Sequence, residues 1–362
     1  MKAVVLAGGQ GTRLKPLTER RPKPLIPVAG RPCIDYILRS LVSAKIRQIV
    51  ITTGYMSDKL IQSIGDGMQY DASILYSFEE RPAGTAGAVK RAGHFVDQET
   101  FVVASGDVLA DVDIAALVAH HKKAGALATI ALTESKEPTE FGIVGLDGED
   151  RIVRFQEKPK PEEVFSHWIN AGIYVLEPEV LRYIPEQKEC DFSRDVFPAL
   201  LAEGKTLSGK RLEGLWMDIG RHQDLLRASV EIIRRQGKEL DIQGVDSRGP
   251  VILGQGVTLE KGVRIRGPAY IGDNSFLSRG TLIQDSCIYD NVFVDRGAVI
   301  QESIILSGSR VGWQSEIRSS IVSTRCTIEE DVRLVNSIVG DDMRVKIHSR
   351  LEDASIAPPS ET

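Results

Sequence analysis

The sequence predicts an α/β domain followed by a parallel β-solenoid. From residue 1 to about 235, short apolar runs alternate with helical patterns, which is typical of a Rossmann-like, mainly parallel sheet covered by helices on both faces. Further along, aliphatic residues recur every five or six positions, and four serines, Ser286, Ser303, Ser320 and Ser337, lie 17 residues apart. We therefore expect domains at 1–236 and 249–355, a connector at 237–248 and a flexible tail at 356–362.

The elements of the first domain follow from this alternation. The strands are predicted at residues 3–6, 48–52, 73–77, 100–104, 128–132, 142–146 and 172–176. The helices are predicted at residues 33–44, 57–64, 84–92, 114–124, 178–183, 195–202 and 225–235. Sheets of this kind bind ligands beyond the carboxyl ends of their strands. A glycine-rich loop, Glu79 and Asp107 would all emerge at that edge.

The second domain is predicted to be a coil with three faces, because each turn of 17 or 18 residues adds one strand to every face. Its inward aliphatic residues are expected at positions 253, 259, 265, 271, 277, 283, 288, 294, 300, 306, 311, 317, 322, 328, 334, 339, 345 and 351. Such hexad repeats resemble the left-handed parallel β-helix. The coils leave no room for an inserted loop and hold a single histidine, His348. We therefore expect a structural and oligomerising domain whose serines lie at corners or stack.

Composition excludes several classes of function. The 362 residues carry a net charge of −5 without a basic stripe, which argues against nucleic-acid binding. Cys33, Cys190, Cys287 and Cys326 are far apart and form no CxxC pair, so neither a zinc site nor a disulfide framework is expected. Apolar runs are too short for a signal peptide or a membrane span. A cytoplasmic protein is expected.

A glycine-rich loop after the first strand carries the main functional signal. Gly8, Gly9 and Gly11 allow backbone N–H groups to face an anion closely. Arg13 adds a planar cation, and Lys23, between two prolines, is expected in an extended segment that fixes a second charge. A dinucleotide fingerprint needs an immediate helix and a P-loop needs Gly-Lys-Ser/Thr, and neither follows. The pattern predicts a polyphosphate site.

Two distant acids predict a magnesium site. Asp107 follows an apolar strand, and Asp218 lies among apolar residues before a glycine. Either acid alone is as well explained as a helix cap. Mg²⁺, however, prefers one or two carboxylates together with phosphate oxygens and water, so both acids and a triphosphate would complete its coordination.

Further polar residues suggest a sugar-phosphate pocket. Lys158 could pair with a phosphate, and Glu157 could accept from vicinal sugar hydroxyls. The alternative is a surface ion pair at a strand end. The small residues that follow Gly84 would let a helix N-terminus approach a base or ribose.

These motifs, taken in order, resemble those of the sugar-1-phosphate nucleotidyltransferases that carry a C-terminal β-helix. The matching motifs are LAGGQGTRLKPLT, PKPLIPV, GTAGA, GD at 106–107, EKP, NAGIY and WMDIG. They span nearly the whole chain. The residues of these motifs are also similar to those of mannose-1-phosphate guanylyltransferases, although enzymes with several sugar specificities share them.

The resemblance implies a role for each matching residue. Nucleotide contacts would come from Leu6, Ala7, Gly8, Gly9, Gly11, Thr12, Arg13, Glu79, Gly84 and Asp107. Sugar-phosphate contacts would come from Gly142, Glu157, Lys158, Asn170 and Gly172. Catalytic charges would come from Arg13, Lys23 and Lys158, and Mg²⁺ ligands from Asp107 and Asp218. The implied reaction transfers a nucleotidyl group from a nucleoside triphosphate to a sugar 1-phosphate and releases pyrophosphate.

The choice of nucleotide stays open at this point. A carboxylate at Glu79 can accept the two adjacent donors of guanine, which favours GTP and mannose 1-phosphate, although strand phase could instead turn Glu80 inward. Transfer of a thymidylyl or uridylyl group to glucose 1-phosphate is the alternative. The short thymidylyltransferases resemble one another in a Gly-Asp-Asn motif at this place. This chain has Val108 in place of the asparagine, which weakens the thymidylyl interpretation. Two rivals are a non-catalytic regulatory homologue of the translation exchange-factor kind and a bifunctional acetyltransferase.

Overall fold

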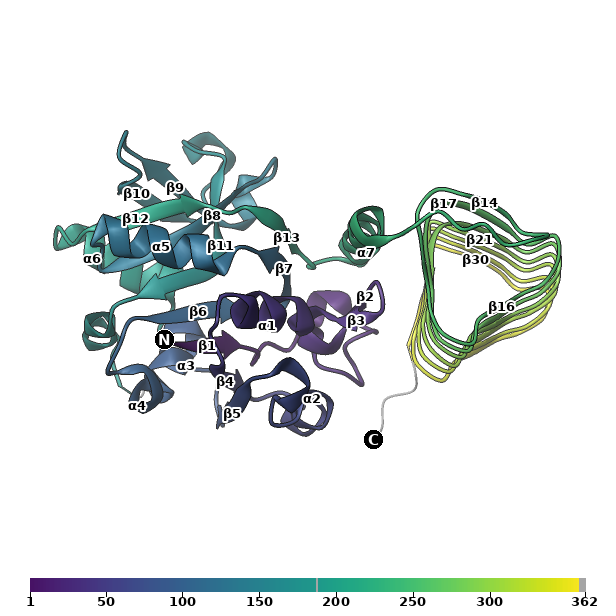
Figure 1. Cartoon of the computed structure of the whole chain (residues 1–362), viewed down its shortest axis with the longest axis horizontal. Helices are drawn as coiled ribbons and strands as arrows, with labels where there is room; N and C mark the ends of the chain where they lie inside the picture. Colours follow the sequence, from purple (N-terminus) through teal and green to yellow (C-terminus); the bar gives the residue numbers. More distant parts are fainter. Residues whose placement is uncertain (187, 358–362) are drawn as a thin grey trace. The chain divides into compact units, whose positions relative to one another are not determined.

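A computed structural model describes residues 1–186 and 188–357, which fall into two compact units (Figure 1). Unit 1 contains residues 1–10, 22–25 and 33–218, and unit 2 contains residues 11–21, 26–32 and those from 219 onward. The chain thus passes from unit 1 to unit 2 within the glycine loop, between Gln10 and Gly11. Most of the predicted tail, 358–362, lies outside the described residues.

Unit 1 is built on a sheet of nine strands in the order β10-β9-β11-β6-β1-β4-β5, in which β8 joins β11 to β12. The strands are β1 (Lys2–Leu6), β4 (Gln48–Thr53), β5 (Ser73–Phe78), β6 (Phe101–Ser105), β8 (Ala128–Glu134), β9 (Gly142–Leu146), β10 (Ile152–Glu157), β11 (Trp168–Leu176) and β12 (Leu207–Arg211). A separate antiparallel pair joins β7 (Val108–Val112) to β13 (Gly214–Asp218). The sequence patterns did not predict β7, β10, β12 or β13.

Strand directions in the nine-stranded sheet are mixed. The strands β6, β1, β4 and β5 run parallel, as do β8 and β12. By contrast β11 is antiparallel to β6, β8 and β9, and β10 is antiparallel to β9. The α/β class predicted from sequence is confirmed, with a parallel half that presents its carboxyl ends at one edge.

Helices fill the connections of unit 1. They are α1 (Cys33–Ser43), α2 (Ser57–Ile64), α3 (Gly84–Arg91), α4 (Gly93–Val96), α5 (Ile114–Ala124) and α6 (Phe197–Ala202). Short 3-10 turns occur at Lys23–Leu25, Met68–Tyr70, Pro138–Glu140, Pro161–Glu163 and Pro178–Tyr183. The segment predicted as a helix at 195–202 begins instead as a π-helical turn over Phe192–Val196. Asp113 caps α5 by accepting from the Ala116 N–H at 2.9 Å.

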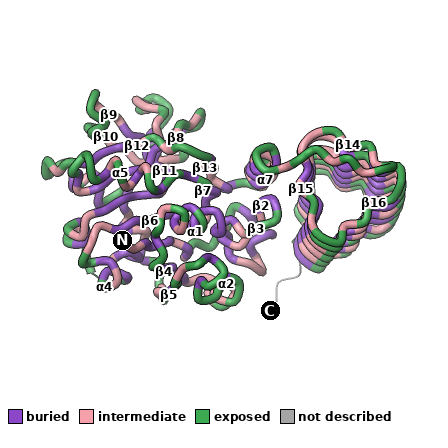
Figure 2. The backbone as a smooth tube through the Cα atoms, viewed as in Figure 1, coloured by how far each residue is buried: buried purple, intermediate pink, exposed green. Residues whose placement is uncertain are grey.

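The sheet of unit 1 separates two apolar cores. Alternation along β1 shows this directly, because Ala3 and Val5 belong to one core and Val4 to the other. The buried residues form a continuous layer along the sheet (Figure 2). A sheet buried on both faces explains why its strands read as unbroken apolar runs in the sequence.

Unit 2 contains a 3-10 turn at Thr12–Leu14, the short pair β2 (Pro27–Val28) and β3 (Arg31–Pro32), helix α7 (His222–Gln236) and the solenoid. Helix α7 packs on the solenoid strands β17 (Arg264–Ile271) and β19 (Leu282–Ile288). The hydroxyl of Tyr289 donates to the Pro27 carbonyl at 2.8 Å, and Arg21 pairs with Asp341 at 2.7 Å. The segments 11–21 and 26–32 are therefore held by unit 2.

The solenoid is a three-sided parallel coil, as predicted, and its triangular section is visible in Figure 1. Its remaining strands are β14 (Asp246–Arg248), β15 (Val251–Leu253), β16 (Thr258–Leu259), β18 (Phe276–Leu277), β20 (Phe293–Val294), β21 (Val299–Gln301), β22 (Ile304–Ile305), β23 (Arg310–Val311), β24 (Glu316–Arg318), β25 (Ile321–Val322), β26 (Thr327–Ile328), β27 (Arg333–Val335), β28 (Ile338–Val339), β29 (Arg344–Val345), β30 (Arg350–Glu352) and β31 (Ser355–Ile356). Each strand pairs in parallel with the equivalent strand of the next coil.

Most of the predicted inward aliphatic positions lie in the solenoid core, and two do not. Ile305 rather than Leu306 points inward, so the five-residue step falls between Ile300 and Ile305. Leu253 is 36% exposed, and Val251 takes the core position of its coil. The hexad count was wrong at Leu306 because the adjacent Ile305 satisfies the spacing equally well. It was wrong at Leu253 because Val251 lies eight residues before Leu259, outside the regular spacing.

The four periodic serines stack along one corner of the solenoid, as expected. Each hydroxyl accepts from the backbone N–H one coil further on, as Ser303 does from Ser320 at 3.1 Å, and donates to a carbonyl two residues before it, here Gln301 at 2.6 Å. The hydroxyls are buried and fully used in this ladder. Their role is structural.

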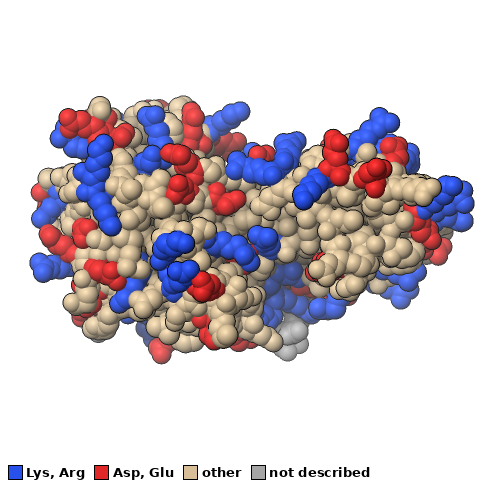
Figure 3. Space-filling view, viewed as in Figure 1, with Lys and Arg blue, Asp and Glu red and all other residues tan. Residues whose placement is uncertain are grey.

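The charged side chains of both signs are interspersed on the face shown in Figure 3. All four cysteines are buried free thiols, in agreement with the expected lack of disulfides. Across the described residues, no helix combines the length and apolar character required to cross a membrane.

Candidate active site

A lysine and two aspartates converge in unit 1. Lys23 Nζ lies 2.9 Å from Asp107 Oδ2 and 3.5 Å from Asp218 Oδ1. Asp107 lies between β6 and β7, immediately before β7, and Asp218 is the last residue of β13. Because β13 pairs antiparallel with β7, Asp218 lies opposite Val108, the neighbour of Asp107. The pairing of β7 with β13 thus brings together two acids that are far apart in sequence.

The electrostatics of this cluster keep the lysine charged. Burial lowers the pKa of Lys23, but the carboxylates of Asp107 and Asp218 outweigh it, and the pKa is raised above its usual value. Lys23 lies in a 3-10 turn closed by the Leu25 N–H on the Pro22 carbonyl at 2.9 Å, and not in the extended segment expected from its flanking prolines. Like an extended segment, this turn holds the backbone of Lys23 in a fixed conformation.

The donor set fits a magnesium ion that shares its coordination with phosphates. Two carboxylates face a common cation, and both remain partly accessible, with side chains 34% and 20% exposed for Asp107 and Asp218. Among residues 1–186 and 188–357 there is no cluster of three acidic, histidine or cysteine side chains that could hold a metal by itself. Mg²⁺ needs only one or two protein carboxylates when phosphate oxygens and water supply the rest.

The start of the glycine loop lies against Glu79. A Cβ added at Gly8 would lie 2.9 Å from Glu79 Oε1, so any side chain at this position would displace the carboxylate. Glu79 Oε2 also accepts from the Ala83 N–H at 3.4 Å. The side chain of Glu79 thus reaches the loop, and it does so beyond the end of β5. Ala7, 2% exposed, anchors the loop through its N–H on the Thr52 carbonyl at 2.9 Å.

The second half of the loop belongs to unit 2. Gly11 has a φ of 64°, a left-handed conformation that glycine adopts readily, and it precedes the turn that carries Thr12 and Arg13. Gly8, Gly9, Lys23 and the acids are in unit 1. The structure therefore assigns the predicted triphosphate residues to two units, and their joint role stays a prediction.

A second polar cluster forms where β11 bulges. Asn170 is 9% exposed, and its Nδ2 donates to Ser193 Oγ at 2.8 Å and to the Tyr174 hydroxyl at 3.0 Å. Its Oδ1 accepts from the Gly172 N–H at 2.9 Å. Gly172 has a φ of 70°, within the register shift of β11 between Asn170 and Tyr174. The bulge thus orients the Asn170 amide completely.

Glu157 adjoins this cluster at the end of β10. Burial, followed by the nearby Asp191, raises its pKa, and a hydrogen bond with Ser193 opposes the shift. A Cβ added at Gly142 would lie 2.7 Å from Glu157 Oε2, which explains the glycine there. Lys158 follows in a left-handed conformation, with its N–H donating to the Phe141 carbonyl at 3.0 Å.

The N-terminus of α3 is closed by protein backbone. The Cys190 carbonyl accepts from the N–H groups of Ala86 and Gly87, each at 3.0 Å, and a Cβ at Gly84 would lie 2.4 Å from it. These two N–H groups are therefore used within the protein, and the approach of a base or ribose to the start of α3 stays a prediction. The assignment of Gly84 itself as a base-side contact stays a prediction.

Sequence reasoning missed Asp191 and Ser193. Asp191 accepts from Thr85 Oγ1 at 2.7 Å and from the Ser193 N–H at 2.8 Å, which fixes the π-helical turn that presents Ser193 to Asn170. The segment offers no motif, and π-helical turns leave no periodic signature. π-Helical turns occur frequently at functional sites, so the turn itself indicates the role of these residues once the structure is known.

The nucleotidyl transferase family profile matches residues 2–235, and the GMPPB C-terminal domain profile matches residues 265–361. A UTP–glucose-1-phosphate uridylyltransferase of Synechocystis is 33% identical over 321 residues, covering 80% of this chain and 83% of that protein. A mannose-1-phosphate guanylyltransferase of Mycobacterium tuberculosis is 36% identical over 288 residues, covering 79% of each. The fold and the carboxylate cluster agree with these matches: the chain belongs to the nucleotidyl transferase family.

A solved structure supports the same fold. A Bacillus anthracis protein assigned as a glucose-1-phosphate thymidylyltransferase matches with a TM-score of 0.58 and 30% identity, covering 64% of this chain and 94% of that chain. Mannose-1-phosphate guanyltransferases of fungi also match, the Saccharomyces cerevisiae protein with 36% identity over 66% of this chain and 68% of its own length.

Proposed function

We propose that the protein transfers the guanylyl group of GTP to mannose 1-phosphate, giving GDP-mannose and pyrophosphate. The observation that carries this proposal is the convergence of Lys23, Asp107 and Asp218 at the carboxyl edge of a nucleotidyl transferase sheet. Relatives named mannose-1-phosphate guanylyltransferase or guanyltransferase align over 66% to 79% of the chain, which favours this pair of substrates.

Asp107 and Asp218 would hold Mg²⁺, which when bound offsets the negative charge of the phosphates. The residues themselves do the positioning. Lys23 Nζ, already between the two carboxylates, is proposed to contact a phosphate oxygen, and the N–H groups of Gly8 and Gly9 are proposed to face the triphosphate. Arg13 is proposed to bind the phosphates that leave as pyrophosphate.

The sugar phosphate needs no protein base, because its oxygen is already anionic at neutral pH. That oxygen forms a bond to the α-phosphorus while the bond from the α-phosphorus to the bridging oxygen breaks, and pyrophosphate departs with the electron pair. The protein therefore contributes positioning and charge stabilisation. We propose that Lys158 holds the attacking phosphate.

Sugar hydroxyls are proposed to bind the Glu157 and Asn170 cluster. Asn170 is locked by Ser193 and Gly172, so its orientation costs nothing on binding. Gly142 leaves room beside the Glu157 carboxylate. Both amide hydrogens of Asn170 are already donated to Ser193 and Tyr174. The groups that would accept from adjacent hydroxyls of a hexose are therefore the Glu157 carboxylate and the remaining lone pair of Asn170 Oδ1.

Guanine is favoured by Glu79. A carboxylate beside Gly8 can accept both the ring N–H and the exocyclic amine of guanine, whereas uracil and thymine present one such donor. Uridylyl transfer to glucose 1-phosphate is the second candidate, because a relative of that name aligns over 80% of the chain. We also propose that the solenoid supports a homo-oligomer, since large apolar side chains such as Trp313 and Ile347 are exposed on it.

The test is a pyrophosphate-release screen of GTP, UTP, dTTP and ATP against mannose, glucose, galactose and glucosamine phosphates. GTP with mannose 1-phosphate should give the highest kcat/KM, and EDTA should abolish turnover until Mg²⁺ is restored. A preference for a pyrimidine nucleotide would overturn the guanylyl assignment. Turnover that persists in EDTA would overturn the magnesium assignment.

A further inference from the structure

A cavity of about 610 Å³ lies within unit 2. Its walls come from three parts of that unit: Arg13 of the glycine loop, the first turns of α7, and one corner and face of the solenoid. Volumes of this size are typical of small-molecule sites. Every lining residue belongs to unit 2.

The floor of the cavity is an apolar strip. Ile304, Ile321 and Ile338 stack in register on β22, β25 and β28 and face outward, opposite to the neighbouring residues that fill the solenoid core. Ile304 and Ile321 are buried and Ile338 is half-buried. Ile304 is 0% and Ile321 is 5% exposed, so Ile338 is the part of the strip that presents apolar surface to the cavity.

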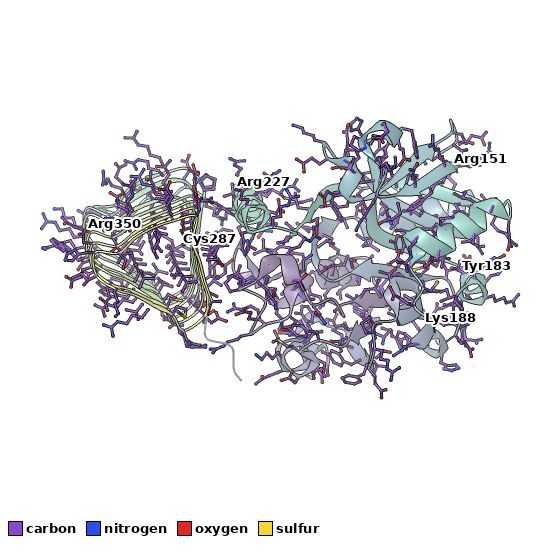
Figure 4. The ribbon with its side chains drawn as sticks, turned by 180° about the vertical axis from the view of Figure 1, so that it is seen from behind. Arg151, Tyr183, Lys188, Arg227, Cys287 and Arg350 are labelled. Atoms are coloured by element: carbon purple, nitrogen blue, oxygen red, sulfur yellow. The ribbon has the colours of Figure 1, made fainter. Side chains whose placement is uncertain are left out.

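Cations gather above this strip. Arg221 is the N-cap residue of α7, and Arg227 lies in its second turn. Arg13 also lines the cavity, but it is already proposed to bind the departing pyrophosphate, so the second site rests on Arg221 and Arg227. Glu302 is the single acidic residue among the lining side chains, so positive charge prevails. Asp224, one turn from Arg227, is 3.6 Å from it and offsets part of its charge. Figure 4 labels Arg227 on α7 and Cys287 on β19, the strand that α7 contacts.

His222 adds a neutral hydrogen-bonding group. Burial lowers its pKa, with a smaller opposing effect from the backbone of Leu14 and Lys15, so the ring is uncharged at pH 7. Its Nε2 atom is buried without a hydrogen-bond partner in the described chain. A buried nitrogen left unsatisfied costs free energy that a bound ligand could recover.

We propose that this cavity is a second binding site, for a phosphorylated nucleoside. Guanidinium groups recognise phosphate oxygens through paired N–H donors, which Arg221 and Arg227 supply. The isoleucine strip suits the flat face of a base, and the amides of Gln223 and Asn336 in the lining suit its polar edge. The catalytic reaction proposed above needs one nucleotide site, so this site goes beyond it.

Inorganic phosphate shares the arginine chemistry but not the apolar strip. A site selected for free phosphate would need no apolar floor. The isoleucine strip would then face the cavity without an apolar ligand to cover it. The joint presence of both surfaces favours a ligand with both parts. Comparison of GDP with inorganic phosphate separates the two possibilities.

The experiment is calorimetric titration of the full-length protein with GDP. The wild type should bind two GDP molecules per chain, and Arg227→Ala should reduce the count to one or weaken the second site at least 10-fold. Arg227 is largely exposed, so its removal should not unfold the chain. The matched control is Arg234→Ala, seven residues along α7 and outside the cavity, which should retain both sites.

A second variant tests the floor. Ile338→Ser should weaken the second GDP site several-fold while leaving the weak binding of inorganic phosphate unchanged. Identical titrations of Arg227→Ala and Arg234→Ala would overturn the proposal. One GDP per wild-type chain that Arg227→Ala removes would keep the second site and contradict the guanylyl assignment of the active site instead. Equal affinity for phosphate and GDP at this site would exclude a nucleoside ligand. The comparison of Arg227→Ala with Arg234→Ala therefore separates failure of the second site from failure of the guanylyl assignment.

Discussion

Lys23 and Asp107 form a close ion pair, with Nζ 2.9 Å from Oδ2, although 84 residues separate them in sequence. The same ammonium is 3.5 Å from Asp218 Oδ1. One cation therefore balances two carboxylates that would otherwise repel each other. A divalent ion and a phosphate can replace this arrangement without leaving either acid buried and unpaired.

Asp218→Asn should lower kcat by about 10²–10³-fold, the range found when a preorganised electrostatic partner is removed. The side chain keeps its size, and Lys23 keeps its pairing with Asp107, so the thermal unfolding temperature should change little. Steady-state kinetics and thermal unfolding measure the two effects. Asp111→Asn, an exposed acid on the adjacent β7, is the control and should keep normal turnover. Wild-type kcat in Asp218→Asn would remove it from the site.

Glu157→Gln should stabilise the protein more at pH 7 than at pH 4. The pKa of Glu157 is raised above its ordinary value of 4.5 by burial and by Asp191, so ionising it costs folding free energy. That cost is absent below the unfolded pKa and reaches its full value above the folded pKa. Urea unfolding at both pH values measures the difference.

The control for this prediction is Glu162→Gln, which changes an exposed carboxylate nearby. It should give the same small effect at both pH values. If Glu157→Gln were equally stabilising at pH 4 and pH 7, the environment of the carboxylate would not be the one described.

Gly84→Ala should destabilise the protein by roughly 2 kcal/mol or more. Gly84 has a φ of 73°, and an added Cβ would lie 2.4 Å from the Cys190 carbonyl oxygen, a backbone atom that cannot move freely. Gly93→Ala is the matched control, because its Cβ would meet one side-chain atom at 3.8 Å. Urea unfolding of the two variants should separate them clearly. Similar stabilities would contradict the close packing of α3 against Cys190.

Ser193→Ala should raise the KM for the sugar phosphate by about 5-fold with a smaller change in kcat, because a lost hydrogen bond of about 1 kcal/mol loosens Asn170. The same variant should raise the pKa of Glu157 further, since Ser193 opposes its shift. Initial rates as a function of pH measure both effects. Ser63→Ala on the surface of α2 is the control. A fall in kcat alone would contradict a positioning role.

Ser320→Ala should destabilise the solenoid by about 1–3 kcal/mol, because the Ser337 N–H, which bonds to Ser320 Oγ at 2.9 Å, would be buried without a partner. The half-buried Ser349 provides the control, and Ser349→Ala should have little effect. Thermal unfolding followed by circular dichroism measures the change. Equal effects of the two substitutions would show that the serine ladder does not support the coil.

The sequence by itself determined the local features of the protein. The apolar runs of β1, β4 and β9, the helical periods of α2 and α5, and the 17-residue serine spacing all follow from neighbours in the chain, so periodicity predicts them. Ser303 and Ser320 stack because each coil repeats the last. The polyphosphate role of the glycine loop was likewise predicted from adjacent residues, and it stays a prediction.

Tertiary structure alone decided which distant residues meet. The pairing of β7 with β13 places Asp218 beside Asp107, and no pattern in either segment encodes that partner. The Cys190 carbonyl closes α3, and Ser193 orients Asn170, through contacts between segments whose spacing in sequence carries no period. Long-range pairing depends on how whole elements pack, and the free energy of packing is not written in any one stretch of chain.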